Sequence, residues 1–244
     1  MEFSTIQVVE RPERVGIITL NRPRMRNAIS IQMRHEILAC LDLLKNSSEV
    51  RVVIFTGGGS AFSAGFDLNE FDHPELFNEI LQSSSKYHRE VWNFSKPTIA
   101  AVNGPAMAGG FDLTTLCDIR ICSESASFGH PEIKFGVPPL FTPLRWIIGA
   151  GLARDLCLTG RRIDAREAHR IGLVSEIVSG DELIERSIQI GSNIMEAPLE
   201  TLQYTKTYLI GNDGLRFEES FYVEHDRAFY EFLQKRRKEK LKEK

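Results

Sequence analysis

Short apolar runs rich in β-branched residues recur along the chain, and longer segments with helical patterning separate them. Runs of this length are typical of strands buried in a sheet. The sequence predicts such strands at 15–20, 50–56, 97–102, 119–122 and 173–178. Because strands that alternate with helix-length segments are typical of parallel sheets, this order favours an α/β fold built from parallel β-α units over a β-sandwich.

The spacing of apolar residues also indicates helices. Ser30 is predicted to cap a helix whose apolar residues recur at helical spacing, namely Ile37, Leu38, Leu41 and Leu44. A polar helix is expected across 74–94, and the chain from 141 onward is mostly helical in pattern. The stretch 217–244 predicts a long amphipathic helix that packs on its own core or on another subunit. With 244 residues, the chain is expected to form one large domain, alone or with an appendage.

The composition limits the kinds of binding partner and the cellular compartment that we expect. A formal net charge of −3 gives no general reason to expect nucleic acid or a membrane as partner, and no apolar run approaches the length that spans a bilayer. The four cysteines lack CxxC spacing and residues 1–20 lack a signal-peptide pattern, so buried free thiols and a cytoplasmic location are expected. Residues 235–244 carry seven Lys or Arg against two Glu, which fits either a solvated helix end or a positive patch for a phosphorylated ligand.

Two acidic residues, Asp112 and Glu132, each follow a turn made of small residues. Asp112 lies in the segment Asn-Gly-Pro-Ala-Met-Ala-Gly-Gly-Phe-Asp-Leu (103–113), and Glu132 lies in Ser-Phe-Gly-His-Pro-Glu-Ile (127–133). A pair of carboxylates near one water divides acid and base duties when their surroundings separate their pKa values. We therefore expect Asp112 and Glu132 to form a pair that moves protons.

Two backbone N–H groups near these acids are candidate donors to an oxyanion. A helix is expected to begin near Gly109, where the first N–H groups have no partner within the helix and the helix dipole is positive. Phe66, in the turn 61–68, can supply a second N–H from a separate loop. A glycine-rich turn alone is commonly structural, and the lysine of a phosphate-binding loop is missing here. Together with the acids, the two donors suit enolate chemistry on a thioester.

These motifs occur in one order along the chain. They are, from the N-terminus, Asn21-Arg22-Pro23 with Asn27-Ala28, the turn 61–68, the segment 102–110, and Phe128-Gly129-His130-Pro131-Glu132. In this order and spacing the chain resembles the crotonase superfamily, specifically the enoyl-CoA hydratases and isomerases. The similarity extends over essentially the whole chain and includes the segments 158–162 and 172–174.

The resemblance implies a fold, a partner and an assembly. It implies a spiral of repeated ββα units, with a crotonase core over 1–195 that binds CoA and carries out catalysis. A C-terminal helical region over 196–244 would mediate oligomerisation, as a homotrimer or a dimer of trimers, and would cover the CoA site. The partner would be an acyl-CoA thioester. CoA would be part of the substrate, with no separate cofactor and no metal.

The resemblance also assigns roles to residues of the site. Phe66 and Gly109 would form the oxyanion hole, Asp112 would help to hold and activate a water for attack on C3, and Glu132 would handle the proton at C2. The reaction implied is the reversible syn hydration of a 2-enoyl-CoA to a 3-hydroxyacyl-CoA. The alternatives are double-bond isomerisation of an enoyl-CoA or dienoyl-CoA, in which Glu132 alone shuttles a proton, and a non-catalytic or RNA-binding role, which only the basic tail supports.

Two departures from the family pattern bear on this choice. Asp112 replaces the usual hydratase glutamate and is one methylene shorter. Aspartate at this position is also familiar in dienoyl-CoA isomerases, but those enzymes carry a further aspartate where this chain has Leu140. The stretch 136–143 contains three prolines in place of a glycine-rich turn, and it either shapes the acyl pocket or only packs a loop.

Contacts with CoA follow from the resemblance alone. Arg22, Arg24 and Arg26 lie on the turn that lines the CoA entrance in relatives, where cations suit phosphates. For each of them an exposed arginine with no ligand is the alternative. Ala64 is expected to contact the adenine side through its backbone. His130 either hydrogen-bonds near the pocket or is a loop residue without a role in the site.

Overall fold

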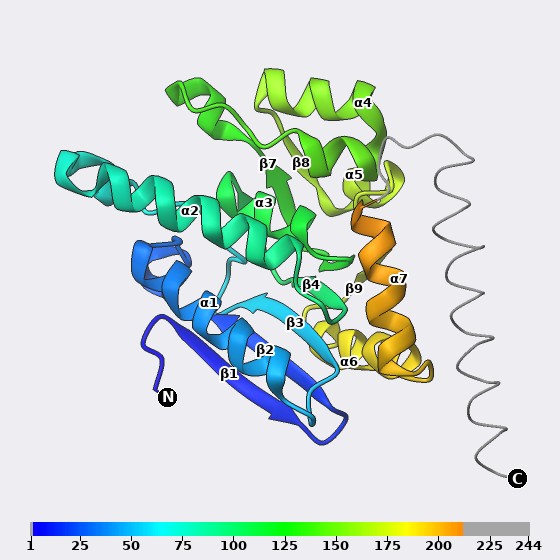
Figure 1. The fold of residues 1–244 in the computed structure, drawn as a ribbon. Coiled ribbons are helices and arrows are strands. Elements are labelled where there is room, and N and C mark those ends of the chain that lie inside the picture. The colour runs from blue at the N-terminus through cyan, green and yellow to red at the C-terminus, as the bar shows by residue number, and fades with distance from the viewer. Residues whose placement is uncertain (1, 212–244) are drawn as a thin grey trace, which may run out of the picture. The chain divides into compact units, whose positions relative to one another are not determined.

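Six strands form the larger of two sheets, in the order β1-β2-β3-β4-β6-β9. The strands are β1 (Ile6–Arg11), β2 (Val15–Leu20), β3 (Val52–Gly57), β4 (Thr98–Val102), β6 (Ile119–Ser123) and β9 (Glu176–Val178). β1 and β2 pair antiparallel as a hairpin, and every later pair in this sheet is parallel. The computed structural model describes residues 2–211, and the chain separates into two compact units, 1–197 and 198–244. Figure 1 shows the sheet in the first unit.

A smaller sheet contains β5 (Pro105–Met107), β7 (Ser127–Gly129) and β8 (Arg162–Asp164), in the order β5-β7-β8. In two successive units of the chain, the first strand joins the larger sheet, the second strand joins the smaller sheet, and a helix follows. β4, β5 and α3 (Gly109–Leu116) make one such unit, and β6, β7 and α4 (Thr142–Thr159) make the next. A bridge between Ser63 and Ala106 adds the preceding turn to the smaller sheet. The predicted α/β spiral of ββα units is confirmed.

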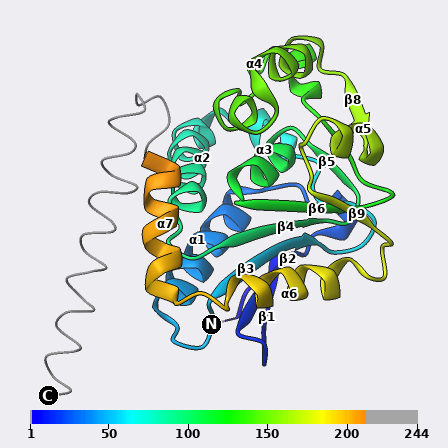
Figure 2. The same ribbon diagram turned by 90° about the vertical axis from the view of Figure 1, so that its right-hand side faces the viewer.

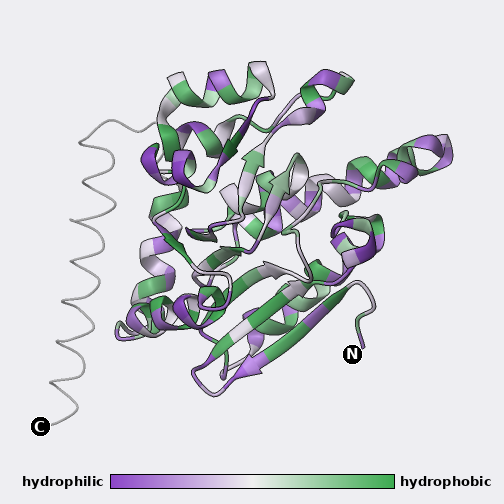
Figure 3. Cartoon of the chain, turned by 180° about the vertical axis from the view of Figure 1, so that it is seen from behind, coloured by the Kyte–Doolittle hydropathy of each residue, from purple (hydrophilic) through white to green (hydrophobic). Residues whose placement is uncertain are grey.

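Helices cover both faces of the larger sheet, as Figure 2 shows. Ile17, Ile54 and Ile99 face one side together with residues of α6 (Leu183–Ile194). Their neighbours in the strands face the other side, where α1 (Ile31–Asn46) and α3 pack and α2 (Phe77–Trp92) lies against both. Because side chains alternate along a strand, a sheet that is buried on both faces needs apolar residues at nearly every position. Figure 3 shows this concentration of hydrophobic residues on the strands.

The remaining elements are short. They are the 3-10 turns η1 (Pro23–Met25), η2 (Leu68–Asp72), η3 (Pro74–Leu76) and η4 (Pro131–Phe135), with α5 (Ala165–Arg170) in the first unit and α7 (Leu199–Gly211) in the second. The N-cap prediction is confirmed, because Ser30 Oγ accepts a hydrogen bond from the Met33 N–H at 3.2 Å. All four cysteines are free and buried.

The predicted C-terminal helix over 217–244 and the basic residues 235–244 lie outside the described residues. Within 2–211, no helix combines the length and the apolar character needed to cross a bilayer. The compartment stays a prediction.

Candidate active site

A single bridge between Ile29 and Phe66 orients the backbone at Phe66. The Asp67 N–H donates to Ile29 O at 3.2 Å, and the Ile29 N–H donates to Gly65 O at 2.8 Å. Because successive N–H groups of an extended segment point to opposite sides, the Phe66 N–H points away from Ile29. It lies beside the start of α3, since a Cβ built on Gly109 would be 3.6 Å from the Phe66 nitrogen.

A strained residue places the N–H of Gly109. Ala108 has φ 50° and ψ −129°, a backbone conformation that costs a non-glycine residue about 1–3 kcal/mol. Its N–H donates to Gly129 O at 3.0 Å, and its O accepts from the Asp112 N–H at 2.9 Å. Gly109 follows as the first residue of α3, so its N–H has no partner within the helix. The N–H groups of Phe66 and Gly109 therefore both lie near the start of α3, where they are candidate donors to one oxyanion.

A cavity of about 720 Å³ opens beside these two donors. Its apolar lining comes from Ala64, Phe66, Leu68, Phe71, Pro131, Phe135, Val137, Pro138, Pro139 and Leu140. Its polar side chains are Ser84, Ser85, His88, Arg89, Asp112 and Glu132. Apolar walls with a few convergent polar groups are typical of a small-molecule site.

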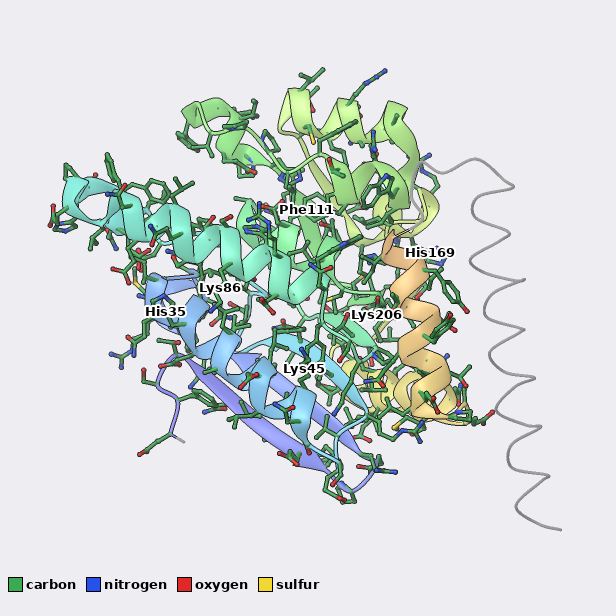
Figure 4. The ribbon with its side chains drawn as sticks, viewed as in Figure 1. His35, Lys45, Lys86, Phe111, His169 and Lys206 are labelled. Atoms are coloured by element: carbon green, nitrogen blue, oxygen red, sulfur yellow. The ribbon has the colours of Figure 1, made fainter. Side chains whose placement is uncertain are left out.

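Asp112 enters this cavity from the first turns of α3. It directly follows Phe111, which Figure 4 labels beside α2, and it is only 8% exposed. Its Oδ2 lies 3.9 Å from His88 Nε2, and its Oδ1 has no hydrogen-bond partner among residues 2–211. Burial raises the pKa of Asp112, and the imidazoles of His88 and His130 oppose this rise.

The histidine two residues before Glu132 holds this second acid in place. His130 Nδ1 lies 2.8 Å from Glu132 Oε1 and 3.9 Å from Asp112 Oδ1, so both carboxylates converge on one nitrogen. The His130 ring is fully buried and stacks on Phe111 at 4.6 Å between centroids. Because a carboxylate only accepts hydrogen bonds, Nδ1 carries the proton. Oε1 is thus fixed, and Oε2, which makes no hydrogen bond within the described part of the chain, is the oxygen available for proton transfer.

His88 is the residue of this site that the sequence predictions missed. It lies on α2, which packs against α3, and its ring contacts Phe66 at 5.9 Å and Tyr87 at 5.2 Å between centroids. No local motif marks it, because a histidine in a polar helix has no distinguishing spacing. Only the packing of α2 on α3 brings His88 to Asp112.

The three arginines predicted for CoA binding do not line the cavity. Arg22 is half-buried, and its guanidinium contacts Asp67 Oδ2 at 2.8 Å and Ala28 O at 2.7 Å. Asp67 also accepts the Asn69 N–H at 3.2 Å, so it braces its own turn. Arg24 and Arg26 are exposed. Their loop adjoins Ala64, whose N–H donates to Arg26 O at 2.9 Å and which lines the cavity.

The proline-containing stretch after η4 lies in the site. Val137, Pro138, Pro139 and Leu140 line the same cavity as the two acids, and α4 begins directly after it at Thr142. Of the two readings of this stretch, a wall of the cavity is the one that the structure shows. Leu140, in place of an aspartate, gives that wall no charge.

Comparison with known proteins gives one consistent result. The family model for enoyl-CoA hydratase/isomerase matches residues 10–243. A putative enoyl-CoA hydratase of Thermus thermophilus is 36% identical over 215 residues, which cover 85% of each chain. The 2,3-dehydroadipyl-CoA hydratase of Escherichia coli is 34% identical, over 83% of this chain and 80% of its own.

A solved structure shares the fold. The crystal structure of an enoyl-CoA hydratase from Bacillus anthracis superposes with a TM-score of 0.88 at 32% identity, over 93% of this chain and 90% of the other. The chain belongs to the enoyl-CoA hydratase/isomerase family.

Proposed function

We propose that this enzyme catalyses the reversible syn hydration of a 2-enoyl-CoA thioester to a 3-hydroxyacyl-CoA. The observation that carries the proposal is the convergence of two carboxylates, Asp112 and Glu132, on one cavity beside the N–H groups of Phe66 and Gly109. An isomerase needs one proton-transferring acid, whereas addition of water needs a second group to direct the water.

The proposed mechanism assigns one step to each group. The thioester oxygen accepts hydrogen bonds from the Phe66 and Gly109 N–H groups, which stabilise the enolate as charge moves onto that oxygen. Asp112 directs a water to C3, and this water gives up one proton as its oxygen bonds to C3. The electron pair of the double bond moves toward C2, where Glu132 Oε2 delivers a proton. His130 keeps Oε1 occupied, so one defined oxygen faces the substrate.

The residues that line the cavity indicate where the acyl group and the CoA part of the substrate would bind. The apolar segment 137–140, with Phe135 beside it, suits the acyl group. The loop that carries Arg24, Arg26 and Ala64 suits the phosphates and adenine of CoA, since Arg24 and Arg26 are exposed there. Arg22 is engaged with Asp67 and supports that loop. The homotrimer or dimer of trimers, and the covering role of 196–244, stay predictions.

One observation favours the second candidate, double-bond isomerisation. Burial raises the pKa of Asp112, which widens the pH range in which this side chain is protonated and is a poor acceptor for a hydrogen bond from the water. Glu132 alone would then move a proton between C2 and C4. Against a dienoyl-CoA isomerase stands Leu140, which leaves the segment after η4 without the further acid that such enzymes carry.

A panel of enoyl-CoA substrates tests the proposed function. We expect loss of the enoyl-thioester absorbance with at least one member of a set that varies in chain length, ring content and terminal charge. A substrate with a terminal carboxylate belongs in the set because Arg89 lines the cavity. Identical mixtures without protein are the control. Unchanged absorbance with every substrate would contradict the proposal.

Replacing Gly109 with alanine tests the oxyanion hole. A Cβ there would lie 2.8 Å from Phe66 Cδ1, and the Phe66 ring has little freedom to move because the Arg34 guanidinium lies over it at 4.7 Å. We expect kcat to fall by about 10²-fold, the effect of misplacing one oxyanion donor. Gly151→Ala, at a position with open space around it, is the matched control. Full activity of Gly109→Ala would place the oxyanion elsewhere.

A further inference from the structure

A third titratable side chain, His88, lies at the same carboxylate as the proposed attacking water. Its Nε2 lies 3.9 Å from Asp112 Oδ2. This separation is too long for a direct hydrogen bond, which needs about 2.8 Å. A single water that donates hydrogen bonds of that length to two acceptors holds them roughly 4 to 4.5 Å apart. At 3.9 Å, His88 Nε2 and Asp112 Oδ2 lie just below this range, so one water can donate to both through slightly bent hydrogen bonds.

The tautomer of His88 is set by its own helix. Nδ1 lies 2.8 Å from Ser84 O, one turn earlier in α2. A carbonyl oxygen only accepts, so Nδ1 carries a proton and donates it to that hydrogen bond. In the neutral ring the lone pair is then on Nε2, which faces Asp112. The contacts with the Phe66 and Tyr87 rings hold the imidazole in this orientation.

We propose that His88 is a catalytic residue of the hydration step, in which Nε2 accepts a hydrogen bond from the attacking water and takes up its proton. The proposal rests on the proposed hydratase function. As the water oxygen bonds to C3, one O–H bond breaks and its proton passes to Nε2, while the electron pair of the double bond moves to C2 and takes a proton from Glu132. The resulting imidazolium lies next to the Asp112 carboxylate, which stabilises it.

The cycle closes through solvent. The His88 side chain is 22% exposed, so the imidazolium can release its proton to water once the product has left. Glu132 takes up a proton from water in the same interval.

His88 also compensates for the short side chain of Asp112. The aspartate is one methylene shorter than the usual family glutamate, and an imidazole from α2 supplies a second contact to the water. Other titratable groups around Asp112 are His130, Glu132, Tyr87 and Cys157.

Two substitutions of His88 separate its chemistry from its packing. His88→Phe keeps an aromatic ring against Phe66 and Tyr87 but has no nitrogen. His88→Gln keeps a polar group that can contact the water but cannot take its proton at neutral pH. His169→Gln, at the surface of α5 (Figure 4), is the matched control. The measurements are kcat and KM for the best enoyl-CoA, the pH profile of kcat/KM, and the melting temperature of each protein.

We expect His88→Phe to lower kcat by about 10²-fold with KM within about threefold of wild type, and His88→Gln to lower kcat by about tenfold. The acid limb of the His88→Phe profile should move to higher pH, because the imidazole opposes the rise in the pKa of Asp112. Wild-type kcat with an unchanged acid limb in either variant would overturn the proposal. If His88→Phe does not fold, His88→Gln decides on the same criteria.

A titration by carboxyl carbon NMR separates this inference from the proposed function. The pKa of Asp112 is measured in wild type and in His88→Phe without substrate, and the difference reports the electrostatic interaction between Asp112 and His88. A pKa of Asp112 that rises in the variant supports the pair, and an unchanged pKa overturns it. A wild-type protein that is inactive on every enoyl-CoA contradicts the hydratase proposal instead.

Discussion

Replacing Glu132 with glutamine is expected to lower kcat for hydration by about 10³–10⁴-fold, the upper range for loss of a general acid. The amide keeps the size of the side chain, and its oxygen still accepts the hydrogen bond that His130 Nδ1 gives to Oε1 at 2.8 Å. The group at Oε2 can no longer give a proton to C2. Addition of water and isomerisation both need this proton, so both should be lost. Initial rates with the best enoyl-CoA measure the effect.

The control for this change is Glu124→Gln, at an exposed position between β6 and β7. It changes the net charge by the same amount and should leave kcat unchanged. Glu132→Gln should melt within a few degrees of wild type, because His130 keeps its partner. A Glu132→Gln protein with more than a tenth of wild-type activity would remove Glu132 from the mechanism.

The second large effect is expected for Asp112→Asn. Without this carboxylate the water at C3 is no longer directed and the imidazolium that forms at His88 loses its counter-charge, so hydration should fall by about 10³-fold. Exchange of the C2 proton of the 3-hydroxyacyl-CoA by Glu132, through the enolate, should survive within about tenfold. Both rates are measured on the 3-hydroxyacyl-CoA in D2O: the absorbance of the enoyl-CoA formed reports loss of water, and deuterium uptake at C2 reports exchange. Loss of both rates together, or of neither, would contradict the role assigned to Asp112.

The pH dependence of stability gives Asp112→Asn a second signature. Burial raises the pKa of Asp112 in the folded protein above its ordinary value, so the folded state binds this proton more tightly than the unfolded state does. The free energy of unfolding therefore decreases as pH rises from the ordinary aspartate range, about 4, through the raised value. Above that window the charged carboxylate is a cost to the fold. At neutral pH we expect Asp112→Asn to melt at a higher temperature than wild type, and at a similar temperature below pH 4. A lower melting temperature at neutral pH would contradict this account.

The sequence predicted the parts of the fold and site that are local in the chain. β2, β3 and β4 have continuous apolar runs because both of their faces are buried, and β2 begins and ends as predicted. The edge strand β1 was not predicted, because its exposed polar residues interrupt the apolar run. The three-residue strands β5, β7 and β8 were not predicted either. Their pairing depends on the arrangement of the spiral and not on a run of apolar residues.

The residues of the site also fall into two groups, those that a local sequence pattern marks and those that only tertiary packing brings together. Each acid and each oxyanion donor is marked by the turn that holds it, because a small-residue turn and the residue that follows it are neighbours in sequence. His88 has no such mark, since it reaches Asp112 only through the packing of α2 on α3. The sequence alone allows two roles for His130, and its burial and its 2.8 Å contact with Glu132 place it in the site. Arg22 was predicted to bind CoA, but its guanidinium pairs with Asp67, a contact between segments distant in sequence that no local pattern marks.

The most direct test of the central claim is the isotopic content of the product formed from a trans-2-enoyl-CoA. The reaction is run once in H2¹⁸O and once in D2O, and the acyl-CoA is analysed by mass spectrometry. The account predicts a 3-hydroxyacyl-CoA with one ¹⁸O at C3 from the first reaction and one carbon-bound deuterium at C2 from the second. An acyl-CoA that gains deuterium or a shifted double bond but no ¹⁸O would contradict it.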